Sequence, residues 1–140
     1  MSDINEAMIF AAGLGKRMYP LSTKVPKPLL KVNGKPIIFY IIENLINLNF
    51  KNIVINTHHL SEKFHDELKP YSRNTKIVFE EEILDTGGGF LNALKRNYFY
   101  NLKSPKVLIN GDILWKKTAN SPIKNIMKNW NEEKMDLLLC

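Results

Sequence analysis

The chain has 140 residues, 44% of them hydrophobic and 24% charged, which is the composition of a folded globular protein of one domain, residues 1–140. Its net charge of +6 is scattered and lacks a recognisable nucleic-acid-reading element, so we expect anionic small molecules as partners and no nucleic acid. The single cysteine, Cys140, excludes an intrachain disulfide and fits a cytoplasmic location, and every apolar stretch is shorter than the roughly 18 to 20 residues of a membrane span.

The first predicted element is a strand that leads into a glycine-containing loop. Residues 6–11 are mostly apolar, as expected of a strand buried on both faces of a parallel sheet. The loop then runs through Ala11, Ala12, Gly13, Leu14, Gly15, Lys16 and Arg17. Ligands of open α/β sheets bind at the carboxyl ends of strands, where glycines let backbone N–H groups approach phosphate oxygens. The loop therefore predicts an anion site.

Two familiar phosphate loops do not fit this stretch. A Walker A loop requires glycine where Phe10 stands, and a hydroxyl for magnesium where Arg17 stands. A dinucleotide-binding fingerprint requires a third glycine, and Met18 takes that place. An ordinary turn with solvated cations stays open as the alternative on the residues of the loop alone.

The residues that follow the loop carry a family resemblance. Pro20-Leu21 and Pro26-Lys27-Pro28-Leu29-Leu30 come after Ala-Ala-Gly-x-Gly-x-Arg-Met. This combination resembles the sugar-1-phosphate nucleotidyltransferases. The resemblance implies that the loop holds a nucleoside triphosphate, that Arg17 contacts its phosphates and that Lys27 neutralises the reacting phosphates. Independently of the resemblance, the two prolines bias the backbone away from the helical region and predict a stiff, extended segment around Lys27.

The middle of the chain predicts alternating strands and helices. Apolar residues recur at helical spacing over 37–48, with Pro36 at the first helical position. Buried strands are predicted over 52–56, 76–80 and 106–110, and a further helix over 61–68. The glutamates at 80–82 are interpreted as solvated surface. This alternation predicts an α/β fold, and the resemblance implies a Rossmann-like three-layer sandwich with a mainly parallel sheet, truncated at its C-terminus.

A second glycine-rich stretch precedes the helical pattern that begins at Phe90. It reads Asp85-Thr86-Gly87-Gly88-Gly89, and three residues without side chains let the backbone approach a flat or charged ligand. In the resembling family an equivalent Thr-Gly-Gly segment borders the nucleotide base, and the form here is most similar to the branch that transfers uridylyl groups to N-acetylmuramate 1-phosphate. The resemblance thus assigns Gly87 and Gly88 to nucleotide binding.

Asp112 follows the strand predicted over 106–110 and reaches the same edge of the sheet as the first loop. Magnesium prefers one or two carboxylates together with phosphate oxygens and water, so one aspartate facing a triphosphate is a sufficient protein anchor. The family's metal-binding Gly-Asp falls at this point in the order of motifs. The resemblance therefore implies that Mg2+ is the cofactor and Asp112 its ligand.

A helix over 122–131 and the start of a strand over 136–140 close the chain. The resemblance covers these residues too, but only the N-terminal part of the family domain, so we expect an incomplete sheet whose C-terminal edge favours self-association.

The implied reaction joins UTP to N-acetylmuramate 1-phosphate in peptidoglycan recycling, giving a nucleotide-sugar and pyrophosphate. Mannose or glucose 1-phosphate as substrate, and a truncated nucleotide-binding fragment without catalysis, stay open as alternatives.

Overall fold

A four-stranded sheet forms the centre of the computed structural model, which describes residues 4–115 and 121–139. Its strands are β1 (Glu6–Phe10), β4 (Asn52–Thr57), β5 (Thr75–Phe79) and β6 (Val107–Asn110). They lie in the order β5-β4-β1-β6, and all their pairings are parallel. A separate two-stranded ribbon, β2 (Lys31–Val32) and β3 (Lys35–Pro36), flanks the turn at Asn33 and Gly34.

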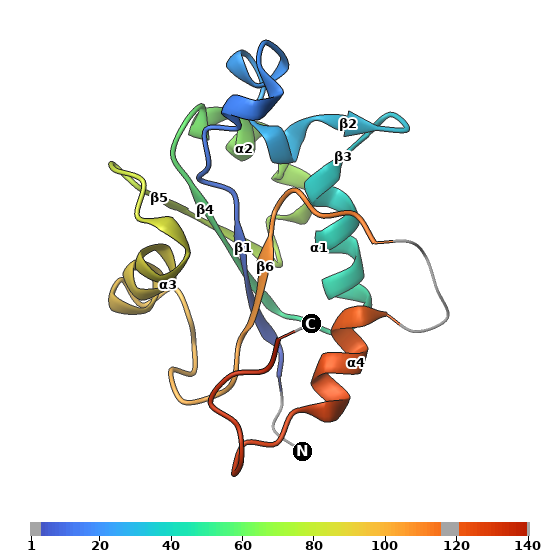
Figure 1. Cartoon of the computed structure of the whole chain (residues 1–140), viewed down its shortest axis with the longest axis vertical. Coiled ribbons are helices and arrows are strands. Elements are labelled where there is room, and N and C mark those ends of the chain that lie inside the picture. The colour runs from blue at the N-terminus through green and yellow to red at the C-terminus, as the bar shows by residue number, and fades with distance from the viewer. Residues whose placement is uncertain (1–3, 116–120, 140) are drawn as a thin grey trace.

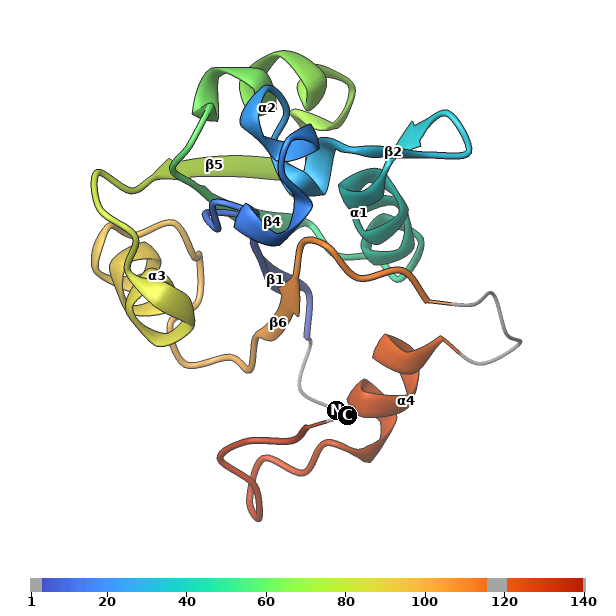
Figure 2. The ribbon, with the colours of Figure 1, turned by 45° about the horizontal axis from the view of Figure 1, so that its top comes forward.

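Helices cover both faces of the sheet (Figures 1 and 2). Three of them, α1 (Ile37–Asn47), α2 (Ser61–Glu67) and α4 (Pro122–Asn129), contribute to one hydrophobic cluster together with Ala7, Ile9, Ile53 and Ile55 of the central strands. On the opposite face, α3 (Asp85–Lys95) packs in a second cluster with Met8 and Val54. Alternate residues of β1 and β4 thus point to opposite clusters, and the predicted three-layer α/β fold is confirmed.

The order of the strands identifies where a ligand belongs. The chain builds β1, β4 and β5 outward in one direction, and then returns to place β6 on the other side of β1. In open parallel sheets such a reversal leaves a crevice at the carboxyl ends of the strands, which is the usual place for a ligand. Residues that follow β1 and β6 therefore meet at this crevice.

The structure corrects two local predictions. Residues 26–30 are not an extended segment, because Lys27–Leu29 form a short 3-10 turn closed by the bond from Leu30 N to Lys27 O. Pro28 fits there because a residue in the first helical turn needs no N–H partner. Pro36 ends β3 instead of opening the helix, and α1 begins one residue later at Ile37.

The glycine-rich stretch and the C-terminal residues also differ from expectation. Gly87, Gly88 and Gly89 lie inside the first turns of α3 rather than in a loop before it. Residues 136–139 form no strand, since they pair with none of the described strands, and Cys140 lies outside the described residues. No helix in the described part of the chain is long and apolar enough to cross a membrane.

Candidate functional site

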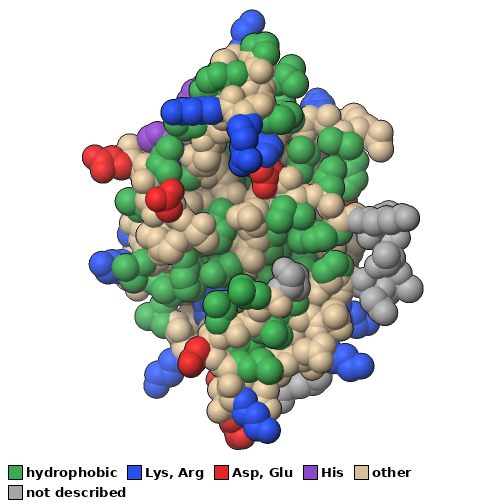
Figure 3. Space-filling view, in the orientation of Figure 1, with side chains coloured by type: hydrophobic (Ala, Val, Ile, Leu, Met, Phe, Trp, Pro, Cys, Tyr) green, Lys and Arg blue, Asp and Glu red, His purple; other side chains and the backbone are tan. Residues whose placement is uncertain are grey.

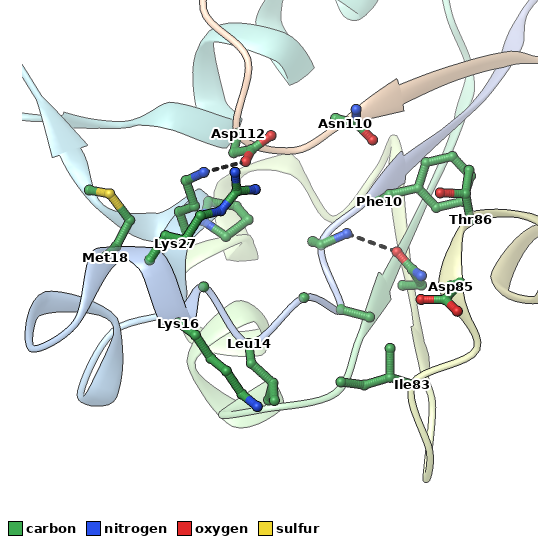
Figure 4. A pocket seen from close by; sticks show the side chains of 17 residues that line it. Phe10, Leu14, Lys16, Met18, Lys27, Ile83, Asp85, Thr86, Asn110 and Asp112 are labelled. Carbon is green, nitrogen blue, oxygen red and sulfur yellow. Dashed lines mark hydrogen bonds and ion pairs between the residues drawn. The ribbon is translucent and has the colours of Figure 1, made fainter.

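A cleft of about 540 Å³ lies at the carboxyl ends of β1 and β6 (Figure 4). It is lined by the end of β1 and the glycine loop, by the turn that holds Lys27, by one residue of β4, by the end of β6 with Asp112 after it, and by Ile83 and the start of α3. The lining residues are Phe10, Ala11, Ala12, Gly13, Leu14, Gly15, Lys16, Arg17, Met18, Lys27, Pro28, Asn56, Ile83, Asp85, Thr86, Asn110 and Asp112. The structure thus brings Arg17, Lys27 and Asp112 into one cleft, and their roles stay predictions.

Hydrogen bonds from the residues that follow the glycine loop fix its conformation at Gly15. Gly15 has a φ of +61°, a conformation that favours glycine, and its carbonyl accepts bonds from the Ser22 hydroxyl at 2.7 Å and from Met18 N at 2.8 Å. At Gly13 no heavy atom lies within 4 Å of the position that a Cβ would occupy. The backbone at Gly13 therefore borders open space, as an anion cradle requires.

Lys27 and Asp112 meet on one side of the cleft although 85 residues separate them in the sequence (Figure 4). Lys27 Nζ donates to Asp112 Oδ2 at 2.6 Å (Figure 4), and both side chains are about one-third exposed, at 29% and 35%. Figure 3 shows Lys and Arg side chains gathered beside an acidic group in the upper part of the visible face. The two opposite charges are therefore held next to each other and in reach of solvent.

The donor set fits a magnesium ion that shares its coordination with phosphate. Among residues 4–115 and 121–139, no group of three or more His, Cys, Asp or Glu side chains comes together to hold a metal. Two carboxylates line the cleft: Asp112 lies beside Lys27, and Asp85 lies on the side of α3. One carboxylate plus nucleotide phosphate oxygens is a common magnesium environment.

Gly87 and Gly88 are not among the residues that line the cleft. Both are exposed, in the first turn of α3, and the lining on this side comes from the preceding Ile83, Asp85 and Thr86. The prediction that this segment borders the cleft therefore fits the two residues before the glycines, Asp85 and Thr86. The assignment of Gly87 and Gly88 to nucleotide binding stays a prediction.

Sequence reasoning missed two buried polar residues at the same edge of the sheet. Asn56 and Glu80 are each only 2% exposed, so the interpretation of Glu80 as solvated surface is wrong. Asn56 Nδ2 donates to Glu80 Oε1 at 2.8 Å, and Asn56 Oδ1 accepts from Ala11 N at 2.8 Å. The position of Glu80 at the end of a predicted strand was the available signal, but it was masked by the exposed Glu81 and Glu82 beside it.

Comparison with known proteins agrees with this geometry. The family model described as nucleotidyl transferase matches residues 6–139. The chain is 31% identical over 139 residues to an N-acetylmuramate alpha-1-phosphate uridylyltransferase of Caulobacter vibrioides, covering 95% of this chain and 56% of that protein. It is 39% identical over 113 residues to the enzyme of the same name from Neisseria meningitidis serogroup B, covering 78% and 47%.

A solved structure of similar fold is the CTP:phosphocholine cytidylyltransferase from Streptococcus pneumoniae, with a TM-score of 0.62 and 33% identity. The match covers 78% of this chain and 46% of that one. The chain thus spans about half the length of each of these three relatives.

Proposed function

The chain belongs to the nucleotidyl transferase family, and from that premise we propose that the protein transfers a nucleotidyl group from a nucleoside triphosphate to a sugar 1-phosphate. In this reaction a phosphate oxygen of the sugar 1-phosphate attacks the α-phosphorus of the triphosphate. The bond from that phosphorus to the β-phosphate breaks, and pyrophosphate leaves with its electron pair. The observation that carries the proposal is the Lys27–Asp112 contact beside the open glycine loop.

The charges of the cleft match the electrostatic demand of this reaction. Both reactants are anions, so their approach requires cations and N–H donors placed in advance. Arg17 and Lys27 line the same cleft as the loop backbone of residues 11–15, and we assign the triphosphate to these groups. Asp112 would hold Mg2+, which when bound would neutralise charge on the phosphates.

UTP and N-acetylmuramate 1-phosphate are our favoured substrates. Two relatives with 31% and 39% identity carry the name of that uridylyltransferase. A structural relative at 33% identity is named for CTP and phosphocholine, so cytidine is a natural competitor in any test of base choice. Mannose and glucose 1-phosphate are the alternative sugars. The single cysteine supports a cytoplasmic location, in which peptidoglycan recycling would supply the sugar.

Titration calorimetry with the magnesium complexes of UTP, CTP, GTP and ATP tests the nucleotide, and a pyrophosphate-release assay with each sugar 1-phosphate tests the transfer. We expect UTP to bind most tightly and N-acetylmuramate 1-phosphate to release pyrophosphate. Equal binding of all four nucleotides would remove the uridine assignment. Nucleotide binding without pyrophosphate release from any sugar would favour a nucleotide-binding fragment without catalysis, and no binding at all would overturn the proposed function.

A further inference from the structure

A largely buried chain of hydrogen bonds joins the two sides of the cleft through Asn56, which lines the cleft. It starts at the backbone N–H of Ala11, the first residue after β1, which donates to Asn56 Oδ1 at 2.8 Å. Asn56 Nδ2 then donates to Glu80 Oε1 at 2.8 Å. Glu80 Oε2 accepts from the backbone N–H of Leu84 at 3.3 Å, one residue before α3 begins. The chain thus connects the glycine loop to the entrance of α3.

The elements around this chain are packed tightly against it. Asn56 is in the central strand β4, and Glu80 directly follows the neighbouring strand β5, with its own N–H bonded to Thr57 O at 2.8 Å. On the other side α3 crosses the pair at Gly89. A Cβ at this position would lie 2.7 Å from Glu80 Oε1 and 2.8 Å from Asn56 Nδ2. The helix backbone therefore rests directly on the two side chains.

The order of donors and acceptors in the chain is fixed by its two ends. Ala11 N–H and Leu84 N–H are both donors, so each must meet an acceptor. The two side chains must therefore supply one acceptor for Ala11 N–H, one acceptor for Leu84 N–H, and one donor with one acceptor for the bond that joins the side chains to each other. An amide next to a carboxylate satisfies this requirement, whereas two amides leave two donors facing each other and two carboxylates leave two acceptors facing each other.

The buried charge of Glu80 also has a place in this arrangement. Within the described part of the chain Glu80 forms no salt bridge, so its carboxylate is compensated by N–H donors and by the positive end of α3. The backbone N–H of Leu84 can donate to the Glu80 carboxylate only if the start of α3 keeps its position. The pair and the helix entrance therefore hold each other in position.

We propose that Asn56 and Glu80 are positioning residues that set the distance between the triphosphate side and the α3 side of the nucleotide cleft. Ala11 leads into the loop assigned to the triphosphate, and the turn fixed at Leu84 carries Ile83, Asp85 and Thr86 into the opposite wall. Breaking the pair therefore moves both walls while leaving Arg17, Lys27 and Asp112 chemically intact. This inference rests on the proposed function.

Exchange of the two chemical groups provides the test. Asn56→Asp alone places two carboxylates together, and Glu80→Gln alone places two N–H donors together. The double variant Asn56→Asp with Glu80→Gln restores the pattern of donors and acceptors. The carboxylate at position 56 then accepts from Ala11 N–H and from the side-chain amide at position 80. The oxygen of that amide accepts from Leu84 N–H. We expect each single variant to bind magnesium-UTP about tenfold or more weakly and the double variant to recover most of the affinity.

The opposite end of β4 offers a matched control. There Asn52 of β4 donates to Glu6 of β1 at 2.7 Å, and both are at most 2% exposed, but neither lines the cleft. Asn52→Asp also places two carboxylates together away from the nucleotide, beside the Lys106 ammonium that lies 3.3 Å from Glu6 Oε2. We expect it to lower the midpoint of thermal unfolding and to leave the affinity of the folded protein for magnesium-UTP unchanged.

Three readouts on the full chain separate the outcomes: thermal unfolding, calorimetric titration with magnesium-UTP below the unfolding range, and the amide NMR shifts of Ala11 and Leu84. The inference requires that the amide shifts of Ala11 and Leu84 change in both single variants. In the double variant, both shifts and the affinity for magnesium-UTP must return toward their wild-type values. A double variant no better than the single ones, or affinity losses that Asn52→Asp reproduces, would overturn it. Wild-type protein that binds none of the four nucleotides would instead overturn the proposed function.

Discussion

Arg17 and Lys27 lie on short turns of the cleft and outside both hydrophobic clusters, so their removal should affect ligands and not folding. We expect Arg17→Ala and Lys27→Ala each to weaken magnesium-triphosphate binding by about 1.5 to 3 kcal/mol, or roughly tenfold to more than a hundredfold, the usual cost of a lost charge-assisted contact. Calorimetry measures this effect. Lys69→Ala, which removes an exposed pair with Asp66, is the control for lost charge alone. Unchanged affinity in both cleft variants would refute the anion cradle.

Glu6 makes stability depend on pH at the far end of the sheet. Burial alone would raise its pKa, but bonds from Asn52 and the backbone N–H groups of Tyr100 and Asn101, with the charge of Lys106, outweigh burial and hold the pKa below the ordinary 4.5. The unfolded chain therefore takes up the proton at higher pH than the folded chain does. The contribution to stability is complete above pH 4.5 and is lost as the pH falls through the lower folded value.

Urea unfolding of wild-type protein and of Glu6→Gln between pH 7 and pH 3 measures this dependence. We expect the wild type to be the more stable at pH 7, and the difference between the two to shrink in the acid range. A difference in the free energy of unfolding that stays constant with pH would show that the charge of Glu6 contributes nothing.

The elements of the fold were largely predictable because their burial patterns are simple. Fully buried central strands give continuous apolar runs, as in β1 and β4, and α1 shows one apolar face at helical spacing. The start of α3 was not predictable from propensity, since three glycines disfavour a helix. Tertiary contacts outweigh this propensity, because the backbone of α3 packs against Asn56 and Glu80. These two side chains are 24 residues apart in the sequence, so their contact is seen only in the structure.

Two glycines of α3, Gly87 and Gly89, should respond differently to the same substitution. At Gly87 no heavy atom lies within 4 Å of the place that a Cβ would take, and its φ is not positive, so Gly87→Ala should stabilise the helix by up to about 1 kcal/mol. Gly89→Ala should destabilise the protein, because its methyl group would collide with the buried Asn56 and Glu80 side chains. Thermal unfolding of the two variants measures the contrast. Equal effects of the two substitutions would contradict the observed path of α3.

At the scale of the whole molecule, the sheet has an open edge at β6. This strand pairs only with β1 among the described strands, and its residues alternate between buried and exposed. Leu108 in the middle of the strand is 40% exposed, and the exposed Leu137 and Leu139 add apolar surface elsewhere on the chain. An unpaired edge strand with apolar side chains is a template for pairing with a second copy.

We therefore expect the 140-residue chain to self-associate as its concentration rises, and Leu108→Lys to reduce this association. A lysine on an edge strand opposes pairing because its charge would be buried between two copies. The fold should tolerate the change, since Leu108 already reaches solvent. Leu102→Lys is the matched control, because Leu102 is 59% exposed but lies outside the strands. Sedimentation velocity over a range of concentrations compares the three proteins. A wild-type chain that stays monomeric throughout, or a Leu102→Lys variant that dissociates as readily as Leu108→Lys, would rule out the β6 edge as the contact.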